Sequence, residues 1–161
     1  MIPANLQTGL TNRLREIFSD FRLKNPNGEE TNLNIYEQNL PQLDADNDIS
    51  FYPYIVVKLA DGEVIDETSL HKIKVLFIVG VFDDALDNQG DKDIVSIIQK
   101  MMEGLQKNPI IEKKFTLSYP LRWTIHEEDV YPFYFGGVET YWETNPIQRE
   151  DIGGIIYDGF I

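Results

Sequence analysis

An unbroken apolar run, Val75 to Val81, constrains the fold of this chain more than any other stretch. It completes the segment HKIKVLFIVGVF, which is rich in β-branched and aromatic side chains and is too short to span a bilayer. Such a segment predicts a β-strand in a central position, because its side chains need cover on one face of the sheet or on both.

Two helices are predicted from apolar residues that recur at helical spacing. The first covers residues 4 to 22 and ends before the turn-forming cluster Asn25-Pro26-Asn27-Gly28. The second covers residues 92 to 107, with carboxylates at its positive end, and stops at Asn108-Pro109. The two stripes comprise Leu6, Leu10, Leu14, Ile17, Phe18 and Phe21, then Ile94, Ile97, Ile98, Met101, Met102 and Leu105.

Four strands and one short extended piece complete the pattern. The piece runs from Leu33 to Gln38, and Asp61-Gly62 predicts a hairpin turn after the first strand. The order of helix, strands, helix, strands predicts an α+β fold with two helices on one face of a mostly antiparallel, four- to five-stranded sheet. We expect one domain over residues 1–145 and a C-terminal arm over 146–161. The predicted strands are Tyr54 to Leu59, Ile73 to Phe82, Phe115 to Ile125 and Val138 to Glu143.

The predicted core combines inward-pointing positions from both helices and the sheet. Its members are Leu10, Leu14, Ile17, Phe18, Ile78, Ile94, Ile98, Met101 and Leu117.

The chain has a net charge of −13 and no cysteine among its 161 residues. Residues 1–24 carry a balance of +2, which leaves about −15 for the remainder. Such a charge repels nucleic-acid backbones, so sequence-specific DNA binding is not expected. The lack of cysteine indicates a reducing compartment, and the N-terminus lacks the pattern of a signal peptide, so we expect a soluble protein.

The sequence offers little for catalysis or metal binding. Neither His71 nor His126 stands in a recognisable constellation with a nucleophile, and no glycine loop has the spacing of a phosphate site. The acidic stretch 44–50 resembles a calcium loop, but it has Ile49 at the glycine position and Ile55 in place of the closing glutamate. We therefore expect no enzyme activity, no cofactor and no metal, and we interpret the acidic trio 127–129 as a solvated strand end or an interface site.

Aromatic residues are the densest signal in the chain. A strand can bury only every second ring, so about half of these rings are expected in the core beside Trp123, and the others should face outward as interface anchors. The apolar C-terminal arm likewise predicts a partner surface. The candidate interaction residues are Tyr131, Pro132, Phe133, Tyr134, Phe135, Tyr52, Ile155, Ile156, Tyr157 and Phe160.

Three segments carry a resemblance to a known family. These are EEDVYPFYFGGVETYWE, SFYPYIVVKLADGE and DIVSIIQKMMEGLQKN. They resemble small prophage proteins of low-GC Gram-positive bacteria that are encoded among head and tail genes. The order of elements over residues 1–145 is also similar to that of the tail terminators of long-tailed phages, whereas the arm after Asn145 has no place in that pattern.

The resemblance implies a structural protein that assembles with itself as a hexameric ring on the head-proximal end of the tail tube. There it would stop tube growth and join the tube to head-completion proteins, in the host cytoplasm first and then in the virion tail. DNA would pass only as transient cargo through an acidic channel, and no membrane is involved. An alternative is an acidic DNA mimic that inhibits a host nucleic-acid enzyme, in which the carboxylates would have to line one face.

Overall fold

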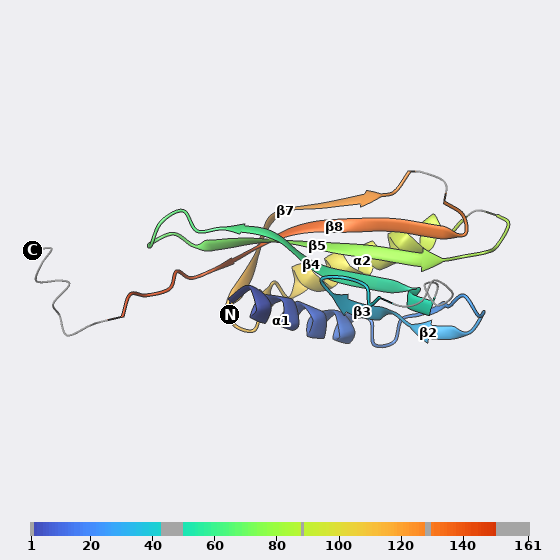
Figure 1. Ribbon diagram of the computed structural model, residues 1–161, viewed down its shortest axis with the longest axis horizontal. Coiled ribbons are helices and arrows are strands. Elements are labelled where there is room, and N and C mark those ends of the chain that lie inside the picture. Colours follow the sequence, from blue (N-terminus) through green and yellow to red (C-terminus); the bar gives the residue numbers. More distant parts are fainter. Residues whose placement is uncertain (1, 43–49, 88, 128–129, 151–161) are drawn as a thin grey trace, which may run out of the picture.

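The computed structural model describes residues 2–42, 50–87, 89–127 and 130–150 and shows an α+β fold (Figure 1). Its main sheet has six strands in the order β3-β4-β5-β8-β7-β6, and a separate two-stranded sheet pairs β1 with β2. The strands are β1 (Arg22–Lys24), β2 (Glu30–Asn32), β3 (Asn34–Glu37), β4 (Tyr54–Glu63), β5 (His71–Phe82), β6 (Ile110–Ile111), β7 (Phe115–Ile125) and β8 (Phe133–Thr144).

The apolar run lies in β5, which is central as predicted. β5 pairs antiparallel with β4 on one side and with β8 on the other, in register from His71↔Thr144 to Phe82↔Phe133. The sheet has more strands than predicted and is mixed in strand direction. β3 adds a parallel pair with β4, and β6 adds a short outer strand. Both additions are brief segments with weak strand signals of their own: β3 pairs with β4 across about twenty residues, and β6 pairs with the start of β7 that follows it in the sequence.

The hairpin turn predicted at Asp61-Gly62 is wrong. Both residues continue β4, where Asp61 pairs with Lys74 and Gly62 with Ile73, after a register shift between Leu59 and Asp61. The chain reverses only beyond Glu63, where the Asp66 carboxylate accepts hydrogen bonds from Thr68 and Ser69. The sheet pairing thus extends through a dipeptide that by itself favours a turn.

Helix α1 (Ile2–Ile17) begins two residues before its predicted start and ends five residues before its predicted end, whereas α2 (Asp91–Lys107) begins one residue early and ends where predicted. Beyond Ile17 the chain turns and enters β1, which pairs with β2. The Asn25 side chain caps the connecting turn by accepting the N–H groups of Asn27 and Glu29, and Gly28 takes a φ of 82°. This local hairpin competes with a longer helix for the same residues.

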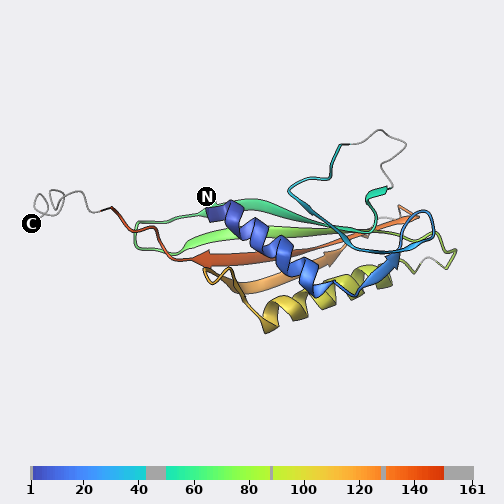
Figure 2. The ribbon, with the colours of Figure 1, turned by 90° about the horizontal axis from the view of Figure 1, so that it is seen from below.

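Both helices cover one face of the main sheet (Figure 2), which we call the inner face. The core between them holds Trp142, Phe77, Phe115 and most of the predicted residues, with Leu10, Leu14, Phe18, Ile94, Ile98, Met101 and Leu117 all buried. Two core predictions need correction. Ile17 is only half-buried at the end of α1, and Ile78 is half-buried on the opposite face because it alternates with Phe77 along β5.

Neither described helix combines the length and apolar content needed to cross a membrane. The stretch considered as a calcium loop lies mostly at 43–49, outside the described residues.

Candidate assembly surface

The face of the sheet opposite the helices, which we call the outer face, carries large apolar side chains without a helix above them. Along β5 the residues alternate, so that Phe77 and Val79 are fully buried while Leu76 and Ile78 are half-buried. The cross-strand pairs Ile78↔Val56 and Ile78↔Gly137 place neighbours from β4 and β8 on this same face. The alternation of β-strands therefore builds a second apolar surface from the same strands.

An aromatic cluster covers one end of the outer face. The ring of Tyr52 lies 5.0 Å from that of Tyr54 and 4.9 Å from that of Phe133, measured between centroids, and Phe135 is 6.2 Å away. Phe133 also meets Phe82 edge-on at 5.7 Å. Burial raises the pKa of Tyr54, with the neighbouring Tyr52 adding to the shift. The cluster is thus a packed, largely apolar platform whose outer rings are only partly covered.

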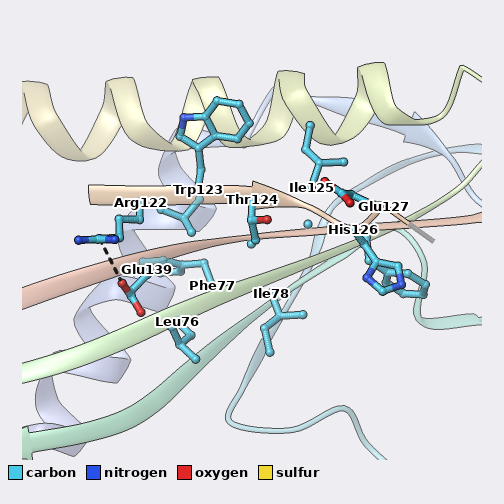
Figure 3. Close-up of a pocket in the computed structure, with 14 residues that line it drawn as sticks. Leu76, Phe77, Ile78, Arg122, Trp123, Thr124, Ile125, His126, Glu127 and Glu139 are labelled. Atoms are coloured by element: carbon cyan, nitrogen blue, oxygen red, sulfur yellow. Dashed lines mark ion pairs between the residues drawn. The ribbon is translucent and has the colours of Figure 1, made fainter. Parts of the chain in front are cut away.

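A groove of about 730 Å³ runs beside this cluster over β5, β8 and β7 (Figure 3). Leu76, Ile78 and Phe135 line it on one side, and Thr124 and His126 line it on the other. Gly137 pairs with Ile78 and Thr124 in the middle of the groove. Because glycine has no side chain, the floor of the groove stays open at this point.

The far end of the groove is polar. The ammonium of Lys74 lies 2.9 Å from one Glu139 oxygen, and the Arg122 guanidinium lies 3.9 Å from the other (Figure 3). The hydrogen bond with Glu139 is the main reason why the pKa of Lys74 is raised. A partner seated here would meet apolar contacts at the aromatic end and a charged network at the other end.

The predicted interaction residues divide between the surface and the interior. Tyr131 is 41% exposed and its hydroxyl donates to the Asp84 carbonyl, while Pro132, Phe133, Phe135 and Tyr52 are half-buried. Tyr134 is only 7% exposed and belongs to the helix-side core, where its ring fills the space beside Gly90. The remaining candidates, Ile155, Ile156, Tyr157 and Phe160, lie outside the described residues.

Trp123 was expected in the core but is 56% exposed, whereas Trp142 is fully buried. Alternation correctly predicts that Trp123 faces the helices, yet β7 lies near the end of the sheet, where α2 covers it only in part. Trp123 lines a second groove with Val95, Gln99 and Met102 of α2. Sequence reasoning missed this surface because it contains no information on which strand is outermost.

Two groups of acidic residues lie at the two ends of the sheet. Asp61, Glu63, Asp66 and Glu67 belong to the β4–β5 end, while the 83–87 stretch follows the other end of β5. Within the described ranges, no group of three histidine, aspartate or glutamate side chains is arranged to hold a metal ion. The outer face between the two acidic ends carries the apolar groove and Glu139, which is paired with Lys74 and Arg122.

No protein-family model matches the chain. No curated protein matches it either. Among solved structures, the chain is similar to one from the virion of a native gene transfer agent particle, with 9% sequence identity and a TM-score of 0.42. The alignment covers 87% of this chain and 94% of that one.

Proposed function

We propose that this chain is a non-catalytic assembly protein of a phage tail. In this proposal, copies of the chain form a hexameric ring on the head-proximal end of the tail tube, end its growth and provide the surface that joins head-completion proteins. The protein acts in the host cytoplasm during assembly and then stays in the virion tail. DNA passes the ring without being bound.

The observation that carries the proposal is the open apolar groove on the outer face, beside the buried cluster of Phe51, Tyr54 and Val56. Helices cover only one side of the sheet, yet the other side presents Leu76, Ile78 and Phe135 beside a cluster of rings. Large apolar groups of this kind, gathered on one surface and bordered by charges, are typical of protein interfaces. The aromatic cluster and the β8 part of the groove belong to two of the three segments, 50–63 and 127–143, that carry the resemblance to phage proteins, whereas Leu76 and Ile78 come from β5.

The charge pattern supports an assembly role more than DNA mimicry. A mimic needs carboxylates in a row along one face, in the spacing of backbone phosphates. Here Asp61, Glu63 and the 83–87 stretch lie at the two ends of the sheet, and the face between them carries an apolar groove in which Glu139 is paired with Lys74 and Arg122. The acidic ends suit a channel through which DNA slides without adhering.

The test is deletion of the coding gene from the genome that carries it, followed by electron microscopy of the particles produced. We expect tails of uncontrolled length and filled heads without tails, and we expect plasmid-encoded protein to restore both. Tails of normal length joined to heads would contradict the proposal. Normal particles together with loss of protection against a host nuclease would favour the mimic.

A further inference from the structure

Most of β7 has a pairing partner on one side only. β6 pairs only with the start of β7, at Phe115 and Thr116, and no other described strand lies along that side of β7. The N–H of His126 donates to the Phe135 carbonyl of β8 at 2.9 Å. Along a strand, the backbone N–H and C=O groups of successive residues point to opposite sides. The backbone groups of Trp123 and Ile125 therefore point away from β8, to the open side.

This open edge is a place where another strand can be added. An unpaired edge offers backbone donors and acceptors to any extended chain, and proteins usually protect such edges. Pro120, which has no N–H, interrupts the middle of β7. The remaining free stretch, Leu121 to Ile125, offers room for about five paired residues, or roughly 17 Å of strand.

The groove beside the edge favours an apolar strand. Trp123 is 56% exposed, Val95 on α2 is 43% exposed, and Met102 of the same helix also lines the groove. Side chains on one side of an added strand would enter this groove, because they alternate with those on the other side. Aromatic anchors of this type contribute most of the binding energy in many interfaces.

The C-terminal segment 151–161 has the composition that this site requires. It follows the last described residue, Glu150. It contains Ile155, Tyr157 and Ile161, which are two and four residues apart and would therefore lie on the same side of an extended strand. Fully extended, its eleven residues span at most about 36–40 Å, enough for a five-residue strand and a linker.

The charges of the two segments are also complementary. Residues 113–125 contain Lys113, Lys114 and Arg122 and no carboxylate, in a chain whose net charge is −13. The C-terminal segment contains Asp151 and Asp158 and no basic residue. Arg122 already faces Glu139 at 3.9 Å, so it has a carboxylate on one side and solvent on the other.

The exit point of the segment favours a neighbouring copy over the same chain. β8 ends at Thr144, opposite the start of β5, and the chain then runs outward past the β4–β5 end of the sheet (Figure 1). The ion pair between Arg149 and Glu67 fixes this direction. The open edge of the same chain lies at the far end of β7, so the segment would have to reverse to reach it.

We infer that the open edge of β7 receives the C-terminal segment of a second copy as an added strand, with its apolar side chains in the groove between β7 and α2. This inference rests on the proposed ring and specifies how neighbouring copies are joined. Donor and acceptor are different surfaces of the chain, so each copy gives a segment to one neighbour and accepts one from the other. Contacts of this head-to-tail kind form a ring when the rotation between neighbouring copies closes, and an open filament when it does not.

Cysteine crosslinking tests the inference, because the natural chain has no cysteine. One full-length variant carries Gln99→Cys in the groove and another carries Tyr157→Cys in the C-terminal segment. Mixed at high concentration with a short bismaleimide, they should give a covalent dimer in roughly tenfold higher yield than a pair in which Asn12→Cys on α1 replaces Gln99→Cys. A chain with both Gln99→Cys and Tyr157→Cys should give a ladder of oligomers.

Two further variants distinguish binding in the groove from nonspecific hydrophobic association. Adding Trp123→Ala to the Gln99→Cys chain should reduce the crosslink roughly tenfold, because an aromatic anchor is lost. Adding Ile110→Ala, which changes another exposed apolar residue, on β6, should leave the yield unchanged. Circular dichroism confirms that each variant is folded.

Three outcomes would overturn the inference. They are a yield equal to that of the Asn12→Cys control, crosslinks within one chain only, or preferred crosslinking of Gln99→Cys to Ile65→Cys at the exposed β4–β5 tip. The proposed function is tested separately by tail length in the deletion strain. Overlong tails in the deletion strain together with a failed crosslink would support the proposed tail function and reject the strand exchange.

Discussion

The inner and outer faces of the main sheet are made by neighbouring residues of the same strands, yet they differ in what covers them. On β5 the inner residues Val75, Phe77 and Val79 are fully buried under the two helices. The outer residues Leu76 and Ile78 are half-buried and border an open groove. Apolar side chains on both faces of a strand therefore do not imply burial of both faces within one protomer. The inner face forms the core of the protomer, and the outer face is where we propose that a partner binds.

The largest effect is expected from Phe77→Ala on the inner face. The change leaves a cavity between the sheet and the helices and should cost about 3–5 kcal/mol of unfolding free energy. Urea denaturation measures this loss. A cost below about 1 kcal/mol would remove the distinction between the two faces, because surface substitutions have effects of that size.

The adjacent glycines of β8 test the same contrast by addition of a methyl group. A Cβ at Gly136 would lie 2.6 Å from Ile94 and 2.9 Å from the Thr124 carbonyl oxygen, so Gly136→Ala should cost about 1–3 kcal/mol. At Gly137 the nearest atom is the Phe77 carbonyl oxygen at 3.1 Å, and Gly137→Ala should cost less. Thermal unfolding of both variants gives the order, and the reverse order would contradict the assignment of the faces.

A smaller effect on stability, with a larger one on assembly, is expected for Ile78→Ser. Ile78 is half-buried in the isolated protomer, so its loss should cost about 1–2 kcal/mol of folding stability. If the outer face binds a partner, the same change should leave many heads and tails unjoined in electron micrographs. Glu16→Ser, an exposed change on α1, serves as the control. Normal joining in the Ile78→Ser particles would argue against a partner at this groove.

The smallest effect is expected at Asp93, at the start of α2. Burial raises the pKa of this carboxyl, and the Asp83 carboxylate adds to the shift. A carboxyl whose pKa is higher in the folded state than in the unfolded state favours folding only after it is protonated, so at neutral pH its charge opposes folding. Asp93→Asn should therefore raise the melting temperature slightly at pH 7. This gain should shrink as the pH falls through the raised pKa, and a gain that grows at acidic pH would contradict the argument.

Much of the fold follows from local periodicity. The stripe of α2 and the alternation of β7 predict their bounds and their inward faces, because the side-chain direction repeats every 3.6 residues in a helix and every two in a strand. Errors arose where a local signal competed with pairing elsewhere. Asp61-Gly62 favours a turn, but the ladder with Lys74 and Ile73 extends β4 through it.

The candidate surface was predicted in part. The sequence located the aromatic residues at Tyr52 and 131–135 and indicated that some would face outward. It did not identify Tyr134 as a core residue, and it did not bring Leu76 and Ile78 into the same surface. These outcomes depend on the register between β5 and β8, which places Ile78 opposite Gly137 and Val81 opposite Tyr134.

The sequence by itself determined the types and order of the elements, the strand at Val75–Val81, the acidic charge and most of the helix-side core. Only the tertiary structure decided that β3 pairs in parallel with β4, that the groove on the outer face stays open and that Trp123 lies at an open edge. The physical reason is that periodicity is a property of neighbouring residues, whereas strand order depends on which distant segments pair. Exposure at an edge then follows from that order, because the last strand has a neighbour on one side only.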